Sequence, residues 1–181
     1  MDKSSPLQLI IDHINLQRIW SKELTLSRGE YLKLENTVDT NLYLIDQGSL
    51  RFFIGNDDDT KTIRFGYSGE LVAALDSYIS SRSSPLFIQA IRKTNVKVIS
   101  KEIFTTFVSN NENLKQAWEQ ILGLLILECM EREIDILTKS PRERYDRVLN
   151  RSPRLFQEIP HKYIASYLNM TPETLSRIKK S

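Results

Sequence analysis

The chain has 181 residues, of which 40% are hydrophobic and 27% charged, and its formal net charge is +2. That length suits one large domain, or a domain with a small additional module, and the apolar content is enough for a substantial core. No run of about eighteen apolar residues is present and the N-terminus lacks the apolar segment of a signal peptide, which excludes a membrane-spanning protein and predicts a cytoplasmic one. The single cysteine, Cys129, precludes an internal disulfide and is expected to be a buried helix residue.

The first hundred residues change from a helical pattern to a strand-like one. Apolar residues at helical spacing predict a short helix over 6–15. From Trp20 to Ser100, short runs such as NLYLIDQG and LRFFIG alternate in polarity and are separated by glycines. Many short strands with turn residues between them are typical of an antiparallel barrel or jelly roll.

Neither the acidic run in this region nor the histidines of the chain indicate a metal site. Asn56 to Asp59 lack the glycine and distal glutamate of a calcium loop, so a solvated hairpin tip is predicted. The two histidines, His13 and His161, fall on predicted terminal helices, whereas a cupin-type site needs several histidines and a carboxylate inside a barrel. No nucleophile–base pair or glycine-rich phosphate loop stands out. We therefore predict that the chain is not an enzyme and uses no metal or other cofactor.

A helical pattern returns after Lys101, first as a short helix at IFTTFV and then as a long one over 111–138. The long helix is apolar on more than one side, so it must be buried against two partners. Its own barrel is one partner and a second copy of the helix is the other, which predicts a two-fold homodimer. The residues predicted at the dimer interface are Leu114, Ala117, Trp118, Ile121, Leu124 and Leu125. The overall fold class predicted is α+β.

A separate helical module follows. Ser140-Pro141-Arg142-Glu143 has the pattern of a capping box with proline at the first helical position. Residues 159–180 then read IPHKYIASYLNMTPETLSRIKK, two short helical patterns joined by a turn. Asn169 tolerates the left-handed conformation that such a turn requires, Thr171 is a candidate N-cap and Pro172 fits the first helical position. This layout is typical of a DNA-binding helix-turn-helix.

The outward face of the last helix has the chemistry for reading DNA. Glu173 and Arg177 are four residues apart and project from one side; an arginine fork matches guanine, and a carboxylate can accept from cytosine. The candidate DNA-binding residues are Thr171, Glu173, Thr174, Arg177, Lys179 and Lys180. The alternative is an ordinary helical hairpin with a solvated Glu–Arg pair.

Charge is unevenly distributed along the chain. Residues 140–181 contain nine Lys or Arg and four Asp or Glu, whereas residues 1–139 contain sixteen and nineteen. A basic C-terminal module on a mildly acidic body is the distribution expected when one end contacts a polyanion. Five further arginines of this module could contact phosphates, but for most of them simple solvation is expected; they are Arg142, Arg144, Arg147, Arg151 and Arg154.

Taken in order, the short helix, barrel, long helix and helix-turn-helix resemble the Crp–Fnr superfamily of transcription regulators. The best local marks are Gly48 in DQGSLRFF, Gly69-Glu70-Leu71, and the terminal ETLSRI, whose full segment is similar to a form common in Bacteroidetes. The resemblance implies an effector domain of the cyclic-nucleotide-binding type over 1–110, a dimerisation helix over 111–139 and a DNA-binding domain over 140–181. It also implies a homodimer that binds double-stranded DNA, with RNA polymerase as a further partner.

Two departures from the family pattern bear on ligand and DNA binding. The Arg-Ser pair that holds a cyclic phosphate in the family falls on Ser84 and Pro85, and Arg82 lies two residues upstream. A buried phosphate needs its cation, so the effector is expected to be something other than cyclic AMP, or absent. The candidate pocket residues are Gly69, Glu70, Leu71, Arg82 and Ser84.

The second departure is at the end of the sequence, at Ser181, directly after the predicted recognition helix, so a full β-wing is not expected. Some phosphate contacts would be lost with it. The cysteines of an iron–sulfur sensor are also missing. The main alternative function is therefore a ligand-binding or protein-interaction module that has lost DNA binding.

Overall fold

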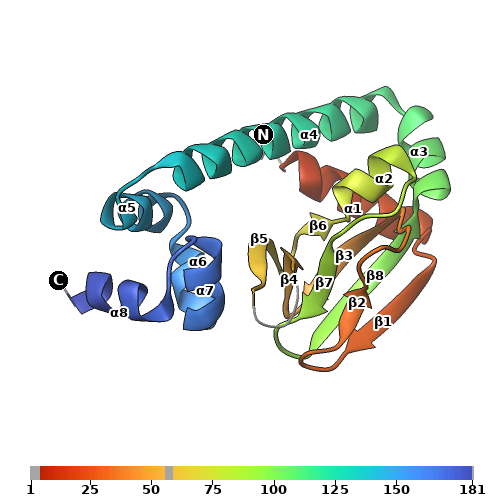
Figure 1. Ribbon diagram of the computed structural model, residues 1–181. Helices are drawn as coiled ribbons and strands as arrows, with labels where there is room; N and C mark the ends of the chain where they lie inside the picture. The colour runs from red at the N-terminus through yellow and green to blue at the C-terminus, as the bar shows by residue number, and fades with distance from the viewer. Residues whose placement is uncertain (1–4, 56–58, 181) are drawn as a thin grey trace. The chain divides into compact units, whose positions relative to one another are not determined.

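A computed structural model of the chain describes residues 5–55 and 59–180; Asn56 to Asp58 of the predicted hairpin tip lie outside this part. The chain is divided into two compact units (Figure 1). The first contains the described residues up to Phe52 together with Phe65–Leu124, and the second contains Phe53–Arg64 together with the residues from Leu125 onward. No helix in the described part is both long and apolar enough to cross a membrane.

The first unit begins with helix α1, Pro6–Gln17, which confirms the predicted leading helix. Its start is set locally, since the hydroxyl of Ser5 accepts a hydrogen bond from the amide of Gln8 and Pro6 occupies the first turn. Its inner face buries Ile10, Ile11 and Ile14.

The strands form two four-stranded sheets with the orders β1-β8-β3-β6 and β2-β7-β4-β5. The pairings of β8 with β1 and β3 are antiparallel, as predicted for this region. The strands are β1 Lys22–Leu26, β2 Tyr31–Lys33, β3 Asn41–Gln47, β4 Ser49–Ile54, β5 Lys61–Tyr67, β6 Leu71–Val72, β7 Phe87–Ala90 and β8 Thr94–Ser100. A core cluster that includes Ile45, Phe52 and Ile88, each at most 1% exposed, is buried among them.

The turn between β3 and β4 shows why Gly48 is needed. Its φ of +102° lies in a region that favours glycine. A Cβ at this position would also lie 2.4 Å from the hydroxyl of Thr94 and 2.6 Å from the carbonyl oxygen of Lys93. Another residue would therefore force the hairpin away from the start of β8.

Three helices complete the first unit: α2 Leu75–Ser80, α3 Lys101–Ser109 and the beginning of α4 Glu112–Leu137. They pack with α1 over a second cluster, in which Phe104 and Leu114 are each 1% exposed. The short helix at IFTTFV and the long helix are thus confirmed, whereas α2 was not predicted. It is only six residues long and no side chain caps its start, so its sequence carries little helical signal.

The second unit contains the rest of α4 and four shorter helices: α5 Pro141–Arg151, α6 Pro153–Glu158, α7 His161–Tyr167 and α8 Pro172–Lys180. The N-cap of the predicted capping box is confirmed, because the hydroxyl of Ser140 accepts a hydrogen bond from the amide of Glu143. The core of these helices is small and apolar; it includes Val148, Ile164, Leu168 and Leu175.

Candidate nucleic-acid interface and effector pocket

Helices α7 and α8 form the predicted helix-turn-helix, and its local signals act as expected. Asn169 has a φ of 49°, the left-handed conformation that turns the chain between the helices. The Thr171 hydroxyl accepts a hydrogen bond of 3.2 Å from the amide of Thr174, which caps α8, and Pro172 is its first residue. Leu168 and Leu175 are both fully buried, so one face of α8 is held against the unit.

The opposite face of α8 is turned to solvent. Glu173, Arg177, Lys179 and Lys180 are exposed, and Thr174 is half-buried. Within residues 5–55 and 59–180, the hydrogen bond of the Arg177 guanidinium is a long one of 3.5 Å, to the Thr174 hydroxyl. The pKa of the Glu173 carboxyl lies below its usual value, because a backbone N–H at the helix start donates to it and the Thr171 hydroxyl and Arg177 charge add to this effect. The face therefore offers an ionised acceptor beside cationic donors.

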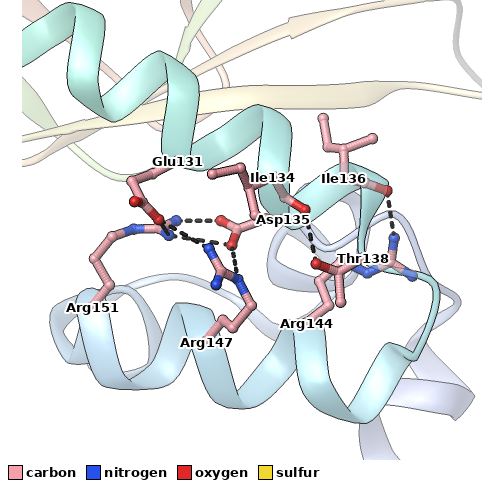
Figure 2. A network of polar contacts seen from close by, with 8 residues as sticks. All are labelled: Glu131, Ile134, Asp135, Ile136, Thr138, Arg144, Arg147 and Arg151. Carbon is pink, nitrogen blue, oxygen red and sulfur yellow. Dashed lines mark hydrogen bonds and ion pairs between the residues drawn. The ribbon is translucent and has the colours of Figure 1, made fainter.

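The arginines of α5 have different surroundings (Figure 2). The Arg147 Nε lies 3.1 Å from a carboxylate oxygen of Asp135, and its Nη2 lies 3.0 Å from Glu131. Arg151 pairs with the same two carboxylates, and the hydrogen bond to Asp135 raises its pKa. Asp135 is completely buried, so this network fixes α5 to the end of α4 within the second unit.

The expectation of simple solvation is wrong for Arg144 and Arg147, which are buried and half-buried, whereas Arg142 and Arg154 are exposed. Arg144 is only 7% exposed and donates to the carbonyl oxygen of Ile136 at 3.3 Å. Arg142 pairs with Asp146 at 3.0 Å and donates to the carbonyl oxygen of Ile178 near the end of α8, and Arg154 pairs with Glu158. Arginines close to the candidate interface thus position its helices through contacts with the protein itself.

Helix α7 is positioned by contacts that the sequence did not indicate. The Ser166 hydroxyl donates to the carbonyl oxygen of Thr60 at 2.8 Å and accepts from the amide of Thr62 at 3.0 Å. Arg132 of α4 donates to the carbonyl oxygen of Thr62 at 3.3 Å, and its guanidinium lies 3.8 Å from the ring centre of Tyr167. All of these residues belong to the second unit.

The candidate pocket residues of the first unit lie on two segments. Gly69, with a φ of +89°, turns the chain between β5 and β6, and its amide donates to the carbonyl oxygen of Ile45 at 2.8 Å. The Glu70 carboxylate accepts from the amide of Tyr67 at 3.1 Å, and Leu71 begins β6. Glu70 therefore supports its own turn.

Arg82 and Ser84 follow α2. Arg82 is exposed, whereas Ser84 is completely buried. The Ser84 carbonyl oxygen accepts from the amide of Asn36 at 2.7 Å, its own amide donates to Thr37 at 3.2 Å, and its hydroxyl accepts from the amide of Leu86 at 3.1 Å. The polar groups of Ser84 are thus already engaged by the first unit.

The predicted dimer residues of α4 differ in exposure. Leu114 and Ala117 are 1% and 4% exposed, and Trp118 and Ile121 pack against the same core cluster. Leu114 and Ala117 have almost no surface left for a partner. Further along the helix, Leu124 is 57% exposed, Leu125 is half-buried and Cys129 is exposed, so the expectation of a buried cysteine is wrong.

Solved structures share this fold over nearly the whole chain, although the sequence matches no protein-family model and no curated protein. A CooA mutant from Carboxydothermus hydrogenoformans has a TM-score of 0.76 at 17% identity, covering 99% of this chain and 84% of that one. FixK2 from Bradyrhizobium japonicum has a TM-score of 0.71 at 18% identity, covering 88% and 82%. The catabolite activator protein of Thermus thermophilus has a TM-score of 0.58 at 18% identity, covering 97% and 85%. At these identities the likeness establishes the fold.

Proposed function

We propose that this chain, which has the fold of the Crp–Fnr regulators, is a sequence-specific DNA-binding transcription regulator that acts as a homodimer. The observation that carries the proposal is α8, a capped helix with a buried inner face and an exposed outer face bearing Glu173, Arg177, Lys179 and Lys180. A helix of this kind can enter a major groove with its N-terminal residues on base edges. Thr171 and Thr174 at the helix start are the proposed phosphate and base contacts beside them.

The domain assignment follows the same fold. Residues 1–110 form the proposed effector domain, 111–139 the dimerisation helix and 140–181 the DNA-binding domain. RNA polymerase is the further partner proposed for a regulator of this type, and the cytoplasm is its proposed location. The solved neighbours named above are regulators and not enzymes, which supports a non-catalytic role.

The exposed side of α4 supports the dimer. Large apolar side chains occur there at steps of three and four residues, which is the spacing of a coiled-coil seam. The exposed fractions of these side chains lie between 46% and 71%, far above those of core residues. The side chains are Leu127, Met130, Ile134 and Leu137. We place the seam on these residues together with Leu124, in place of the buried Leu114 and Ala117. Half-sites on the DNA would then lie roughly 34 Å apart.

The dimer is tested by light scattering on Leu127→Glu/Ile134→Glu. The double variant is expected to be monomeric at micromolar concentration, because two charges would be buried in each copy of the seam. Leu16→Glu is the matched control, since Leu16 is 81% exposed on α1, and it should leave the assembly unchanged. A wild-type chain that is a monomer under these conditions would contradict the proposal.

The effector is proposed to be something other than cyclic AMP, or to be absent. Arg82 is exposed and the polar groups of Ser84 bond to the protein, so the two residues do not offer the cation and hydroxyl that a buried cyclic phosphate requires.

DNA binding is tested by incubating the purified chain with genomic fragments and sequencing those it retains. A regulator enriches a pseudo-palindromic sequence, since a two-fold dimer reads two half-sites. Retention of no fragment above background would instead favour a ligand-binding or interaction module without DNA binding.

A further inference from the structure

Lys33, the last residue of β2, has a buried ammonium group. The residue is only 4% exposed, although lysine is almost never fully buried without partners. Its Nζ donates to the carbonyl oxygens of Leu34 at 2.9 Å, Ser84 at 3.3 Å and Leu86 at 3.0 Å. An ammonium has three N–H donors, so these three carbonyl groups engage all of them.

The contacts of Lys33 close one segment of the first unit onto another. Ser84 and Leu86 lie between α2 and β7, whereas Lys33 and Leu34 lie at the end of β2. Backbone hydrogen bonds of Ser84 with Asn36 and Thr37 join the same two segments. The amide of Asp39 also donates to the Ser77 hydroxyl at 2.8 Å. The lysine is therefore one member of a set of bonds that joins residues 33–39 to residues 77–86.

A second lysine holds residues 78–81, in the middle of the segment 75–86. The Lys101 Nζ donates to the carbonyl oxygens of Tyr78 and Ile79 and to the Ser81 hydroxyl, all at the C-terminal end of α2. A cation there complements the exposed carbonyl groups and dipole of the helix. Residues 78–81 and residues 84–86 are thus each held by an ammonium group of the chain itself.

We propose that Lys33 acts as an internal substitute for a bound ligand, closing residues 75–86 onto β2 so that the effector unit keeps this form without a phosphate-bearing effector. A bound phosphate is held by donors, and the donors of Lys33 are directed at backbone oxygens instead. Those oxygens would repel an anion brought to the same place. The proposal rests on the proposed function only in treating the first unit as an effector domain.

Hydrogen exchange on the full chain tests this closure directly. Lys33→Met keeps the length of the side chain but removes the donors and leaves three carbonyl groups without them. Amides of residues 33–38 and 82–86 should then exchange about tenfold faster or more, as expected for the loss of a hydrogen bond to a charged group. Lys22→Met, at an exposed lysine of β1, is the matched control and should exchange like the wild type. Should Lys33→Met not fold, Lys33→Gln, which retains an uncharged N–H donor, is measured in its place.

A second measurement adds cyclic AMP or cyclic GMP at millimolar concentration to the wild-type chain. The exchange rates of the amides of residues 75–86 are expected to stay unchanged. Slower exchange with either nucleotide would overturn the proposal. Equal exchange rates in Lys33→Met and Lys22→Met would overturn it as well. Both readings are made without DNA. A failure to bind genomic fragments would therefore count against the regulator role alone.

Discussion

Helices α5 and α8 belong to the same unit and both carry several basic residues, but their side chains have opposite environments. On α5, Arg147 and Arg151 are bound to Glu131 and the buried Asp135. On α8, Arg177 is exposed and its guanidinium donates to the neighbouring Thr174 hydroxyl at 3.5 Å. The comparison shows that positive charge alone does not identify a DNA-binding surface. Among the described residues, what distinguishes the candidate surface is that Arg177 forms no ion pair with a carboxylate, whereas Arg147 and Arg151 each form two.

The largest effect is expected from breaking the network of α5. Asp135→Asn should lower the free energy of unfolding of the second unit by about 3 kcal/mol, because it removes the buried charge that Arg147 and Arg151 share. Chemical denaturation followed by circular dichroism measures the loss. Asp146→Asn is the control, since Asp146 forms an exposed pair with Arg142 and should cost less than about 1 kcal/mol. Equal effects of the two variants would contradict the structural role assigned to α5.

The next largest effect concerns base reading by α8. Arg177→Ala should weaken binding to the enriched DNA sequence by about 1–3 kcal/mol and relax the preference at one base position, because a bidentate arginine–guanine pair contributes that discrimination. Fluorescence anisotropy with specific and scrambled duplexes measures both quantities. If Arg177→Ala loses the same amount on both duplexes, the guanidinium contacts phosphate and the base-reading assignment is wrong.

A smaller, uniform effect is expected for the lysines at the end of α8. Lys179→Ala or Lys180→Ala should weaken binding to all duplexes alike and reduce the slope of log K against log salt by about 1, since we propose that each lysine neutralises one phosphate. Titrations at several salt concentrations test this. The control is Lys139→Ala, at an exposed lysine before α5 that should leave the slope unchanged.

The smallest effect concerns the start of α8. The folded-state pKa of Glu173 is depressed below its ordinary value of 4.5, so the folded helix binds fewer protons than the unfolded chain between these two values. The stability that Glu173 contributes is therefore present above pH 4.5 and is lost as pH falls through this window. In NMR titrations the amide shifts of residues 173–175 should follow this change, and Glu173→Gln should abolish it. A titration of Glu173 at its ordinary pKa would contradict the assigned contacts.

Local structure is predictable from the sequence where a contact between near neighbours decides it. Residue type and order are sufficient to predict such features, because the residues involved lie within three positions of each other. Examples are the caps at Ser140 and Thr171 and the left-handed turn at Asn169. The long helix was predicted for a similar reason, because its apolar pattern repeats over many turns. The DNA-reading role of α8 remains a prediction.

Contacts between distant segments could not be predicted in the same way. Alternation along YLKLEN does not reveal that Lys33 is 4% exposed while Leu34 is 52% exposed; that depends on carbonyl groups 51 and 53 residues further along the chain. The partners of the α5 arginines lie on another helix and were also missed. The sequence does carry a signal for this network of ion pairs. The carboxylates of Glu131 and Asp135 are four residues apart, and so are Arg147 and Arg151.

The contacts of Ser166 have a consequence for how the protein behaves at high concentration. β5 is an outer strand of its sheet, and such strands expose N–H and C=O groups that can pair with a strand of another molecule. Ser166 occupies the carbonyl group of Thr60 and the amide of Thr62, while Arg132 occupies the carbonyl group of Thr62. Two side chains from helices thus occupy backbone groups at the start of this strand, which hinders edge-to-edge pairing there.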